Sequence, residues 1–158
     1  MESKINYLLD IEDAHQHQVK VVVTGSWPKE SSSIDFFMPS WSPGSYLMRE
    51  YGRFVRNFRA VNEHGEPYFF EQLDKGTWRV KQNELGLASG KEFFISYTVY
   101  CHELTVRMSH VDSSHAFIHG PSVFMGIKGM EGLQIELKLK FPSEWTKIST
   151  GLKDISPS

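Results

Sequence analysis

The amino-acid sequence predicts an all-β fold: an antiparallel β-sandwich of roughly ten short strands with little or no helix. Three observations lead to this prediction. Apolar residues recur at every second position, turn-forming residues separate these segments, and no stretch of about ten or more residues has the period of a helix. The alternation is clearest over residues 133–141, where Leu133, Ile135, Leu137, Leu139 and Phe141 alternate with polar residues. A strand with one buried and one solvated face requires this pattern.

The same alternation begins the chain and recurs along it. Apolar residues alternate over 5–11 and over 19–23, with a turn expected over 13–16, so the chain is predicted to open with a β-hairpin. Pro43 and Gly44 interrupt the pattern, and residues 46–54 are expected to form at most a short helix or turn. Without long helices, the pattern favours two packed sheets over a parallel α/β fold, whose crossovers need helices. The remaining predicted strands cover residues 34–38, 55–62, 68–73, 77–81, 92–101, 104–110, 115–118, 123–127 and 133–141.

The length of the chain fits one domain, since it has 158 residues. A domain of this size buries roughly 70% of the surface that its unfolded chain exposes, so a core can form without disulfides or metals. We expect the β-sandwich to cover residues 1–148. Residues 149–158 contain glycine, proline and serine and are expected to be the start of a linker.

Charge and hydropathy limit the expected partners. The chain has 17 basic and 19 acidic side chains and a net charge of −2. This argues against nucleic acid or an anionic membrane as the main partner, because both usually require clustered positive charge. The longest uninterrupted apolar run has three residues, far below the roughly 18 that span a bilayer or the roughly 7–15 of a signal peptide. We therefore expect a soluble, cytoplasmic chain with no nucleic-acid or membrane partner.

No complete catalytic motif is visible in the sequence. Residues 102–106 begin like the zinc-peptidase motif His-Glu-x-x-His, but Val106 replaces the second histidine, and the segment is predicted to be a strand instead of a helix. Cys101 is the single cysteine, which excludes an internal disulfide, and it is expected to be a small buried residue, not a nucleophile. Neither a nucleophile elbow nor a glycine-rich phosphate loop is present. We therefore expect no catalytic residue in this chain.

The histidines form two groups in the sequence. His110, His115 and His119 lie within ten residues, and His15 and His17 are expected to share one face of a strand. Metal ligation is conceivable in either group, but no carboxylate or cysteine lies at a spacing that is expected to complete a site. Surface or hydrogen-bonded histidines at strand ends are the favoured interpretation, and no metal site is predicted.

Two segments are less easily explained as scaffold. Residues 38–49 concentrate two prolines, a glycine and two large aromatics, and rigid aromatic loops often line binding sites; a loop that plugs the core is the alternative. Residues 119–125 contain a Gly-Pro turn with backbone amides expected to be free to meet a peptide; an ordinary hairpin turn is the alternative. The candidate residues for contact with a ligand or another domain are Trp41, Pro43, Gly44, Ser45, Tyr46, Arg49, His119, Gly120, Pro121, Ser122 and Val123.

These two segments also carry a resemblance to a known family. Together with the opening residues 7–17 (Tyr-x-Leu-x-Ile-x-Asp-Ala-His-x-His) and with residues 112–118, they resemble the N-terminal domain of the family 61 metallopeptidases, the glycyl-aminopeptidase type that also carries a PDZ domain. The resemblance covers most of the chain, and Trp-Ser-Pro-Gly-Ser-Tyr over residues 41–46 is its most specific element. One position departs from the family pattern: His119 stands where the family has asparagine, which puts an amide-specific contact there in doubt.

The resemblance implies a parent protein in three parts: this β domain, a thermolysin-like catalytic domain with His-Glu-x-x-His and zinc, and a PDZ module. The zinc would belong to the catalytic domain, so this chain itself is expected to hold no cofactor and to be non-catalytic. Its partners would be the catalytic domain of the same polypeptide and the peptide substrate of the parent. A second domain that encloses the cleft can limit the space beyond the first residue of a peptide. The candidate residues are then expected to face the catalytic domain or the substrate.

A different class of function stays open from the residues alone. The chain could be a free-standing β-sandwich module that binds carbohydrate or peptide, with Trp27, Trp41, Trp78 and Trp145 as stacking residues. Such a module should present an open aromatic platform, whereas an enzyme subdomain should present an apolar patch that lacks its intramolecular partner. A third class, a small independent hydrolase, requires a site that these residues do not assemble.

Overall fold

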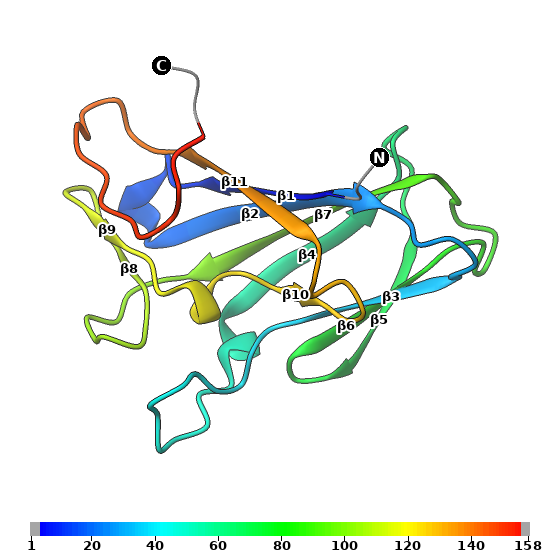
Figure 1. Cartoon of the computed structure of the whole chain (residues 1–158), viewed down its shortest axis with the longest axis horizontal. Coiled ribbons are helices and arrows are strands. Elements are labelled where there is room, and N and C mark those ends of the chain that lie inside the picture. The colour runs from blue at the N-terminus through cyan, green and yellow to red at the C-terminus, as the bar shows by residue number, and fades with distance from the viewer. Residues whose placement is uncertain (1–3, 156–158) are drawn as a thin grey trace.

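Two packed β-sheets form the protein in the computed structural model, which describes residues 4–155 (Figure 1). One sheet has five strands in the order β11-β1-β2-β7-β4, and the other has four in the order β10-β3-β6-β5. A two-stranded ribbon, β8-β9, lies beside them. The all-β sandwich predicted from the sequence is therefore confirmed. The strands are β1 (Lys4–Asp10), β2 (Gln18–Ser26), β3 (Ser33–Phe37), β4 (Val55–Val61), β5 (Phe69–Asp74), β6 (Thr77–Lys81), β7 (Glu92–Tyr100), β8 (His110–Val111), β9 (Ala116–Phe117), β10 (Gly126–Ile127) and β11 (Gln134–Lys140).

The first hairpin follows the predicted alternation. β1 and β2 pair antiparallel with Tyr7 opposite Val23 and Leu9 opposite Val21, and all four side chains are buried. The connection contains a short 3-10 turn, η1 (Ala14–Gln16), in the region predicted to be a turn. His15 therefore lies in this turn and His17 ends it in a left-handed conformation, so the expectation that both share a strand face is wrong.

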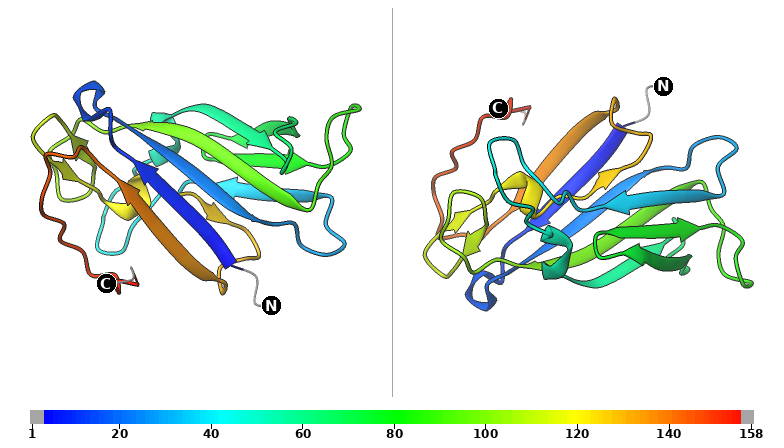
Figure 2. Two further views of the ribbon diagram at one scale, coloured as in Figure 1. Left: turned by 90° about the horizontal axis from the view of Figure 1, so that it is seen from above. Right: turned by 90° about the horizontal axis from the view of Figure 1, so that it is seen from below.

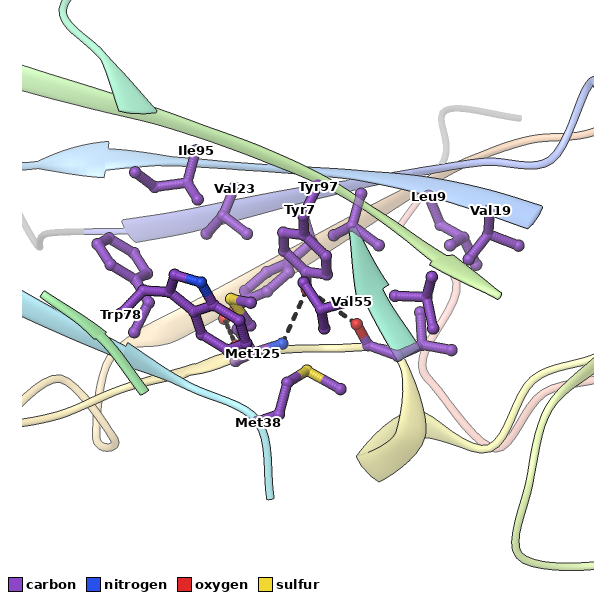
Figure 3. Close-up of a cluster of buried hydrophobic side chains, with 14 of the residues drawn as sticks. Tyr7, Leu9, Val19, Val23, Met38, Val55, Trp78, Ile95, Tyr97 and Met125 are labelled. Carbon is purple, nitrogen blue, oxygen red and sulfur yellow. Dashed lines mark hydrogen bonds between the residues drawn. The ribbon is translucent and has the colours of Figure 1, made fainter. Parts of the chain in front are cut away.

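Two buried tyrosines fasten the segment before β10 to the larger sheet (Figure 3). The Tyr7 hydroxyl donates a hydrogen bond to the Met125 carbonyl at 2.7 Å. The Tyr97 hydroxyl donates to the Val123 carbonyl at 2.8 Å and accepts from the Met125 N–H at 2.9 Å. Burial raises the pKa of Tyr7 to about 12 and raises that of Tyr97 further, so both stay protonated donors. Polar backbone that would otherwise be buried without partners is thereby satisfied.

Three details of the predicted strands differ from the structure. β11 pairs with β1 in parallel, whereas the other strand pairs are antiparallel among the described residues. The strand predicted over 123–127 is shortened to β10, because a third 3-10 turn, η3 (Gly120–Ser122), precedes it. The strand predicted over 104–110 is wrong except for its last residue, because residues 103–109 form an irregular loop.

The predicted domain boundary at residue 148 is not tested by the structure. Residues 141–155 form neither strand nor helix, so a sandwich over 1–148 followed by a linker over 149–158 stays a prediction. Residues 1–3 and 156–158 of that prediction lie outside the described residues. Within the part of the chain that the structure describes, no helix is both long and apolar enough to cross a bilayer.

Candidate functional site

A closed loop, residues 40–49, projects from one end of the sandwich and is called the Trp41 loop here. The Arg49 N–H donates to the Ser40 carbonyl at 2.7 Å, so the two ends of the loop meet. Within the loop, the Ser45 N–H donates to the Ser42 carbonyl at 3.1 Å, with Pro43 and Gly44 between them. Gly44 has φ +82°, so this is the type II turn that favours proline followed by glycine. Two of the candidate residues thus set the backbone of the loop.

The Trp41 loop turns its apolar side chains outward. The Trp41 indole N–H donates to the Ser45 carbonyl at 2.7 Å, while 48% of the residue stays exposed. The Ser45 hydroxyl is buried and donates to the Leu47 carbonyl at 3.0 Å. Tyr46 is fully exposed, and Leu47 and Met48 are mostly exposed. The loop is therefore held by its own hydrogen bonds, while Trp41 stays about half exposed and Tyr46, Leu47 and Met48 stay mostly exposed.

A second loop, residues 103–109, lies beside the Trp41 loop. The Arg107 guanidinium donates to the Gly44 carbonyl at 2.6 Å, and the Arg107 carbonyl accepts from the Tyr51 hydroxyl at 3.0 Å. Leu104 and Val106 are 75% and 81% exposed. Both residues were predicted to lie in a strand over 104–110, a prediction that does not mark them as surface residues. The polar residues around them are the sequence signal that could have indicated an exposed loop instead of a strand.

The His119 turn, defined as residues 119–123, is more buried than the Trp41 loop. It forms η3, in which the Ser122 N–H donates to the His119 carbonyl at 2.9 Å and the Val123 N–H to the Gly120 carbonyl at 3.0 Å. Ser122 and Val123 are buried, whereas His119, Gly120 and Pro121 are partly exposed. The expectation of free backbone amides is therefore wrong for Ser122 and Val123, because both amides donate hydrogen bonds inside the turn.

A closed hydrogen-bond network holds the His119 turn. The Ser122 hydroxyl donates to the His119 carbonyl at 2.8 Å, and the His119 N–H donates to the Ser109 hydroxyl oxygen at 2.9 Å. The Ser109 and Ser122 hydroxyl oxygens lie 2.7 Å apart. Because Ser122 already donates to a carbonyl, Ser109 must donate to Ser122. The turn is thus tied to the same loop that contacts the Trp41 loop.

The Trp41 loop and the His119 turn approach each other through η2 (Tyr51–Phe54). The Tyr51 ring is buried and lies 6.1 Å from the His119 ring, centroid to centroid. Burial lowers the pKa of His119, and the nearby Arg107 cation lowers it further. The Arg49 Nε is buried and makes no hydrogen bond within residues 4–155. The two predicted segments therefore lie at one end of the sandwich, with Arg107 between them.

Burial raises the pKa of the Cys101 thiol to about 12, so the thiol stays protonated, as expected of a buried structural cysteine. His102 forms an isolated β-bridge with His110 and residues 103–106 lie in an irregular loop, so the helix that the zinc-peptidase motif requires is not present over residues 102–106. Of the four tryptophans, Trp78 is buried, Trp27 and Trp145 are partly buried, and Trp41 alone is open to solvent.

The second group of histidines, in and after the β8-β9 hairpin, also differs from the prediction. His110, Asp112 and His115 bring their ligand atoms within 4.8 Å of one another. The statement that no carboxylate lies at a completing spacing is therefore wrong, because the β8-β9 turn folds Asp112 between the two imidazoles. A His-x-Asp-x-x-His pattern over residues 110–115 is the sequence signal that could have found this group. His119 lies outside it.

Comparisons with known proteins place the chain in a family. The chain matches the family model of the peptidase M61 N-terminal domain over residues 6–158. A solved aminopeptidase N family protein from Idiomarina loihiensis superposes with a TM-score of 0.78 and 25% sequence identity, covering 88% of this chain and 22% of that one. The chain thus spans about a fifth of that protein.

Two further comparisons add no argument. A GH20 exo-β-N-acetylglucosaminidase from Vibrio harveyi aligns over 98% of this chain and 21% of its own, but with a TM-score of 0.36 and 9% identity. No curated protein sequence matches the chain. On the family match and the shared sandwich, the chain belongs to the peptidase M61 N-terminal domain family.

Proposed function

We propose that this chain is the non-catalytic front domain of a zinc-dependent aminopeptidase. It packs on the catalytic domain of the same polypeptide and forms one wall of the peptide-binding cleft. The observation that carries this proposal is the Trp41 loop, whose apolar side chains are ordered in position and uncovered. The family match supplies the class of parent protein.

The composition of this surface suits a domain interface. We define the docking surface as Trp41, Tyr46, Leu47, Met48, Leu104 and Val106, with Arg107 joining the two loops. Aromatic residues, methionine and arginine are the side chains enriched at the centres of interfaces. Exposed apolar groups gathered on one loop pair cost free energy unless a partner covers them.

The hydrogen bonds of the Trp41 loop support the same proposal. The loop is closed at its base, contains a type II turn and binds its own indole N–H. A loop already held in one conformation loses less conformational entropy when it docks, so more of the contact energy remains as affinity. A loop whose exposed apolar residues have no binding role does not require these internal hydrogen bonds.

The zinc of the proposed parent finds no fitting site in the motif-like residues of this chain. His102 and Glu103 lie in a loop, and Val106 stands in place of the second imidazole that a peptidase zinc needs on one helical face. We therefore assign the zinc, the general base and the peptide-bond chemistry to the rest of the polypeptide. This domain contributes position and enclosure to the reaction.

A free-standing sugar- or peptide-binding module is the second candidate function. It requires an open aromatic platform, yet only Trp41 of the four tryptophans is open among the described residues. The Trp27 and Trp145 indoles donate hydrogen bonds inside the domain, to the Tyr68 hydroxyl and the Ser113 carbonyl. A single exposed indole inside a wider apolar surface favours a protein partner over a stacked sugar ring.

The coding sequence beyond codon 158 tests the first half of the proposal. A downstream segment with His-Glu-x-x-His and a later glutamate is the expected result. A native stop codon close to Ser158 would contradict the front-domain proposal and leave the binding module as the leading candidate.

Peptide turnover tests the cleft half of the proposal. In the full-length enzyme, Trp41→Ala or Tyr46→Ala should lower kcat/KM by about tenfold or more, because a displaced cleft wall misplaces the substrate. Leu85→Ala is the matched control: Leu85 is also exposed, but its loop, 82–90, lies at the opposite end of the sandwich (Figure 2). Unchanged kinetics in both loop variants would remove the substrate-facing part of the proposal.

A further inference from the structure

The β8-β9 hairpin gathers three side chains that suit a divalent transition metal. β8 carries His110, the turn carries Asp112, and His115 precedes β9. Their ligand atoms all lie within 4.8 Å of one another. We propose that His110, Asp112 and His115 form a binding site for a divalent metal ion of the Zn²⁺ type. This inference does not depend on the docking surface.

The spacing of the donor atoms matches a metal polyhedron. The His110 Nε2 lies 3.0 Å from one carboxylate oxygen of Asp112, and the His115 Nδ1 lies 3.5 Å from the other. Bonds of about 2.1 Å from zinc to nitrogen and oxygen place neighbouring donors roughly 3.0–3.4 Å apart. To bind one ion, the His115 ring must move toward His110 and give up its 2.8 Å hydrogen bond between Nδ1 and the Ser114 hydroxyl, and the exposed position of His115 allows this movement.

Hydrogen bonds from the turn hold the Asp112 carboxylate in place. The Ser114 hydroxyl donates to Asp112 Oδ1 at 2.7 Å. The Ser114 N–H and His115 N–H also donate to Asp112 Oδ1, at 2.7 and 3.1 Å. These bonds fix the direction of the carboxylate, as hydrogen-bonded outer residues do in known metal sites.

The buried imidazole can supply its nitrogen without a large rearrangement. His110 is buried, and its Nε2–H faces a carboxylate that can only accept, so without metal the proton sits on Nε2. Its Nδ1 has no hydrogen-bond partner within residues 4–155. Moving the proton to Nδ1 frees the Nε2 lone pair for the ion. The Nδ1–H that results has no acceptor within residues 4–155, so the bond from Nε2 to the ion must outweigh the cost of this buried, unpaired donor.

The chemistry of the donors selects the metal class. Two imidazoles and one carboxylate suit Zn²⁺, and also Co²⁺ and Ni²⁺, better than Ca²⁺ or Mg²⁺, which prefer all-oxygen sites. Three protein donors also leave a position for water on the open side, where His115 is exposed. His102 stacks on His110 with ring centroids 5.5 Å apart, but it does not belong to the group of mutually close donors.

The bound ion would stabilise the hairpin, which is itself joined to the end of the sandwich by hydrogen bonds. The hairpin contacts His17, the residue just before β2, whose ring donates from Nδ1 to the Val111 carbonyl at 2.6 Å. It also contacts the residues after β11 through the Trp145 indole N–H, 3.4 Å from the Ser113 carbonyl. Binding to the folded state alone raises stability, so thermal unfolding reports occupancy.

Zinc titration of the 158-residue chain, free of any affinity tag, tests the site. Isothermal titration calorimetry with ZnCl₂ at neutral pH should give one equivalent of bound ion. At a concentration about a hundredfold above Kd, Tm should rise by roughly 5–10 °C. His115→Ala removes an exposed donor without opening the core and should weaken binding by about tenfold or more; Asp112→Asn should do the same.

Two controls separate this site from adventitious binding to surface histidines. His64→Ala changes an exposed histidine in a distant turn and should leave affinity within about twofold of the parent chain. His102→Ala should weaken binding less than His115→Ala. Absence of measurable zinc binding, or equal affinity in the parent chain and His115→Ala, would overturn the proposal.

Discussion

The Trp41 loop and the His119 turn look alike in sequence and differ in the structure. Each contains a Pro-Gly or Gly-Pro pair next to large apolar residues. In the Trp41 loop the backbone is closed and the side chains point into solvent, with Tyr46 fully exposed. In the His119 turn Ser122 and Val123 are buried, and the amides that were expected to be free are bonded within the turn.

The difference teaches which of the two segments can meet a partner. The polar groups of the His119 turn are hydrogen-bonded within the domain and its apolar side chain is buried there, so the turn supports the fold. In the Trp41 loop only the backbone, the Ser45 hydroxyl and the indole N–H form hydrogen bonds within the domain, so its apolar side chains are available for contact with a partner. Proline and glycine alone do not separate these cases, because they report backbone conformation and not accessibility.

The largest difference in stability is expected between two variants that each lose one tyrosine hydroxyl, one next to the His119 turn and one in the Trp41 loop. Tyr97→Phe leaves the buried Met125 N–H and Val123 carbonyl without their partner, which should cost roughly 2–4 kcal/mol of unfolding free energy. Tyr46→Phe removes an exposed hydroxyl and should change stability by less than about 0.5 kcal/mol. Urea unfolding of both variants measures the difference. Equal stability of the two would contradict the assignment of the turn to the core.

A smaller effect is expected from two buried serines. Ser122→Ala breaks the closed network with Ser109 and His119 and should cost about 1–2 kcal/mol. Ser45→Ala removes a hydroxyl that bonds only to the backbone of Leu47 in a loop next to solvent, and should cost about 0.5–1 kcal/mol. Chemical denaturation measures both values. A larger loss from Ser45→Ala would mean that the Trp41 loop is part of the folding core.

The smallest expected effect is a pH dependence that belongs to the His119 turn. Burial and the Arg107 cation lower the pKa of His119 below its ordinary value of 6.5. The unfolded chain then binds the proton more readily than the folded chain, so this contribution to stability is complete above pH 6.5 and is lost as pH falls below it. His119→Gln should reduce the difference between the urea midpoints at about pH 7.5 and pH 5.5.

The control for the pH experiment is a histidine outside the turn. His64→Gln, at an exposed position, should retain the pH dependence of the parent chain. The same pH dependence in His119→Gln and the parent chain would show that the turn does not hold His119 in its neutral form.

The strands were predictable where one face of a strand is buried. Residues 77–81 match β6, and the alternation of Ile5, Tyr7 and Leu9 matches β1, because burial on one face imposes a period of two. The same rule failed at Leu104 and Val106, which alternate with polar residues but are exposed. Their spacing resembles a strand only because the sequence does not say what lies against an apolar residue.

Contacts between segments that are distant in sequence were harder to predict than the strands. The parallel pairing of β11 with β1 joins the last strand to the first, and no local pattern encodes a partner so far away in sequence. The Trp41 loop was recognised as a candidate site from its composition, but the contact of Arg107 with Gly44 that places a second loop beside it was not. Asp112 was passed over because the hairpin turn, and not a regular spacing, brings it between His110 and His115.

The affinity of the chain for the remainder of its polypeptide is the most direct test of the central proposal. The two parts are produced separately and titrated by isothermal calorimetry. Tyr46→Ala combined with Leu47→Ser should weaken binding by about thirtyfold or more without lowering the Tm of the chain, whereas Leu85→Ser should leave both unchanged. Undiminished affinity of the double variant would contradict the assignment of the Trp41 loop as the docking surface.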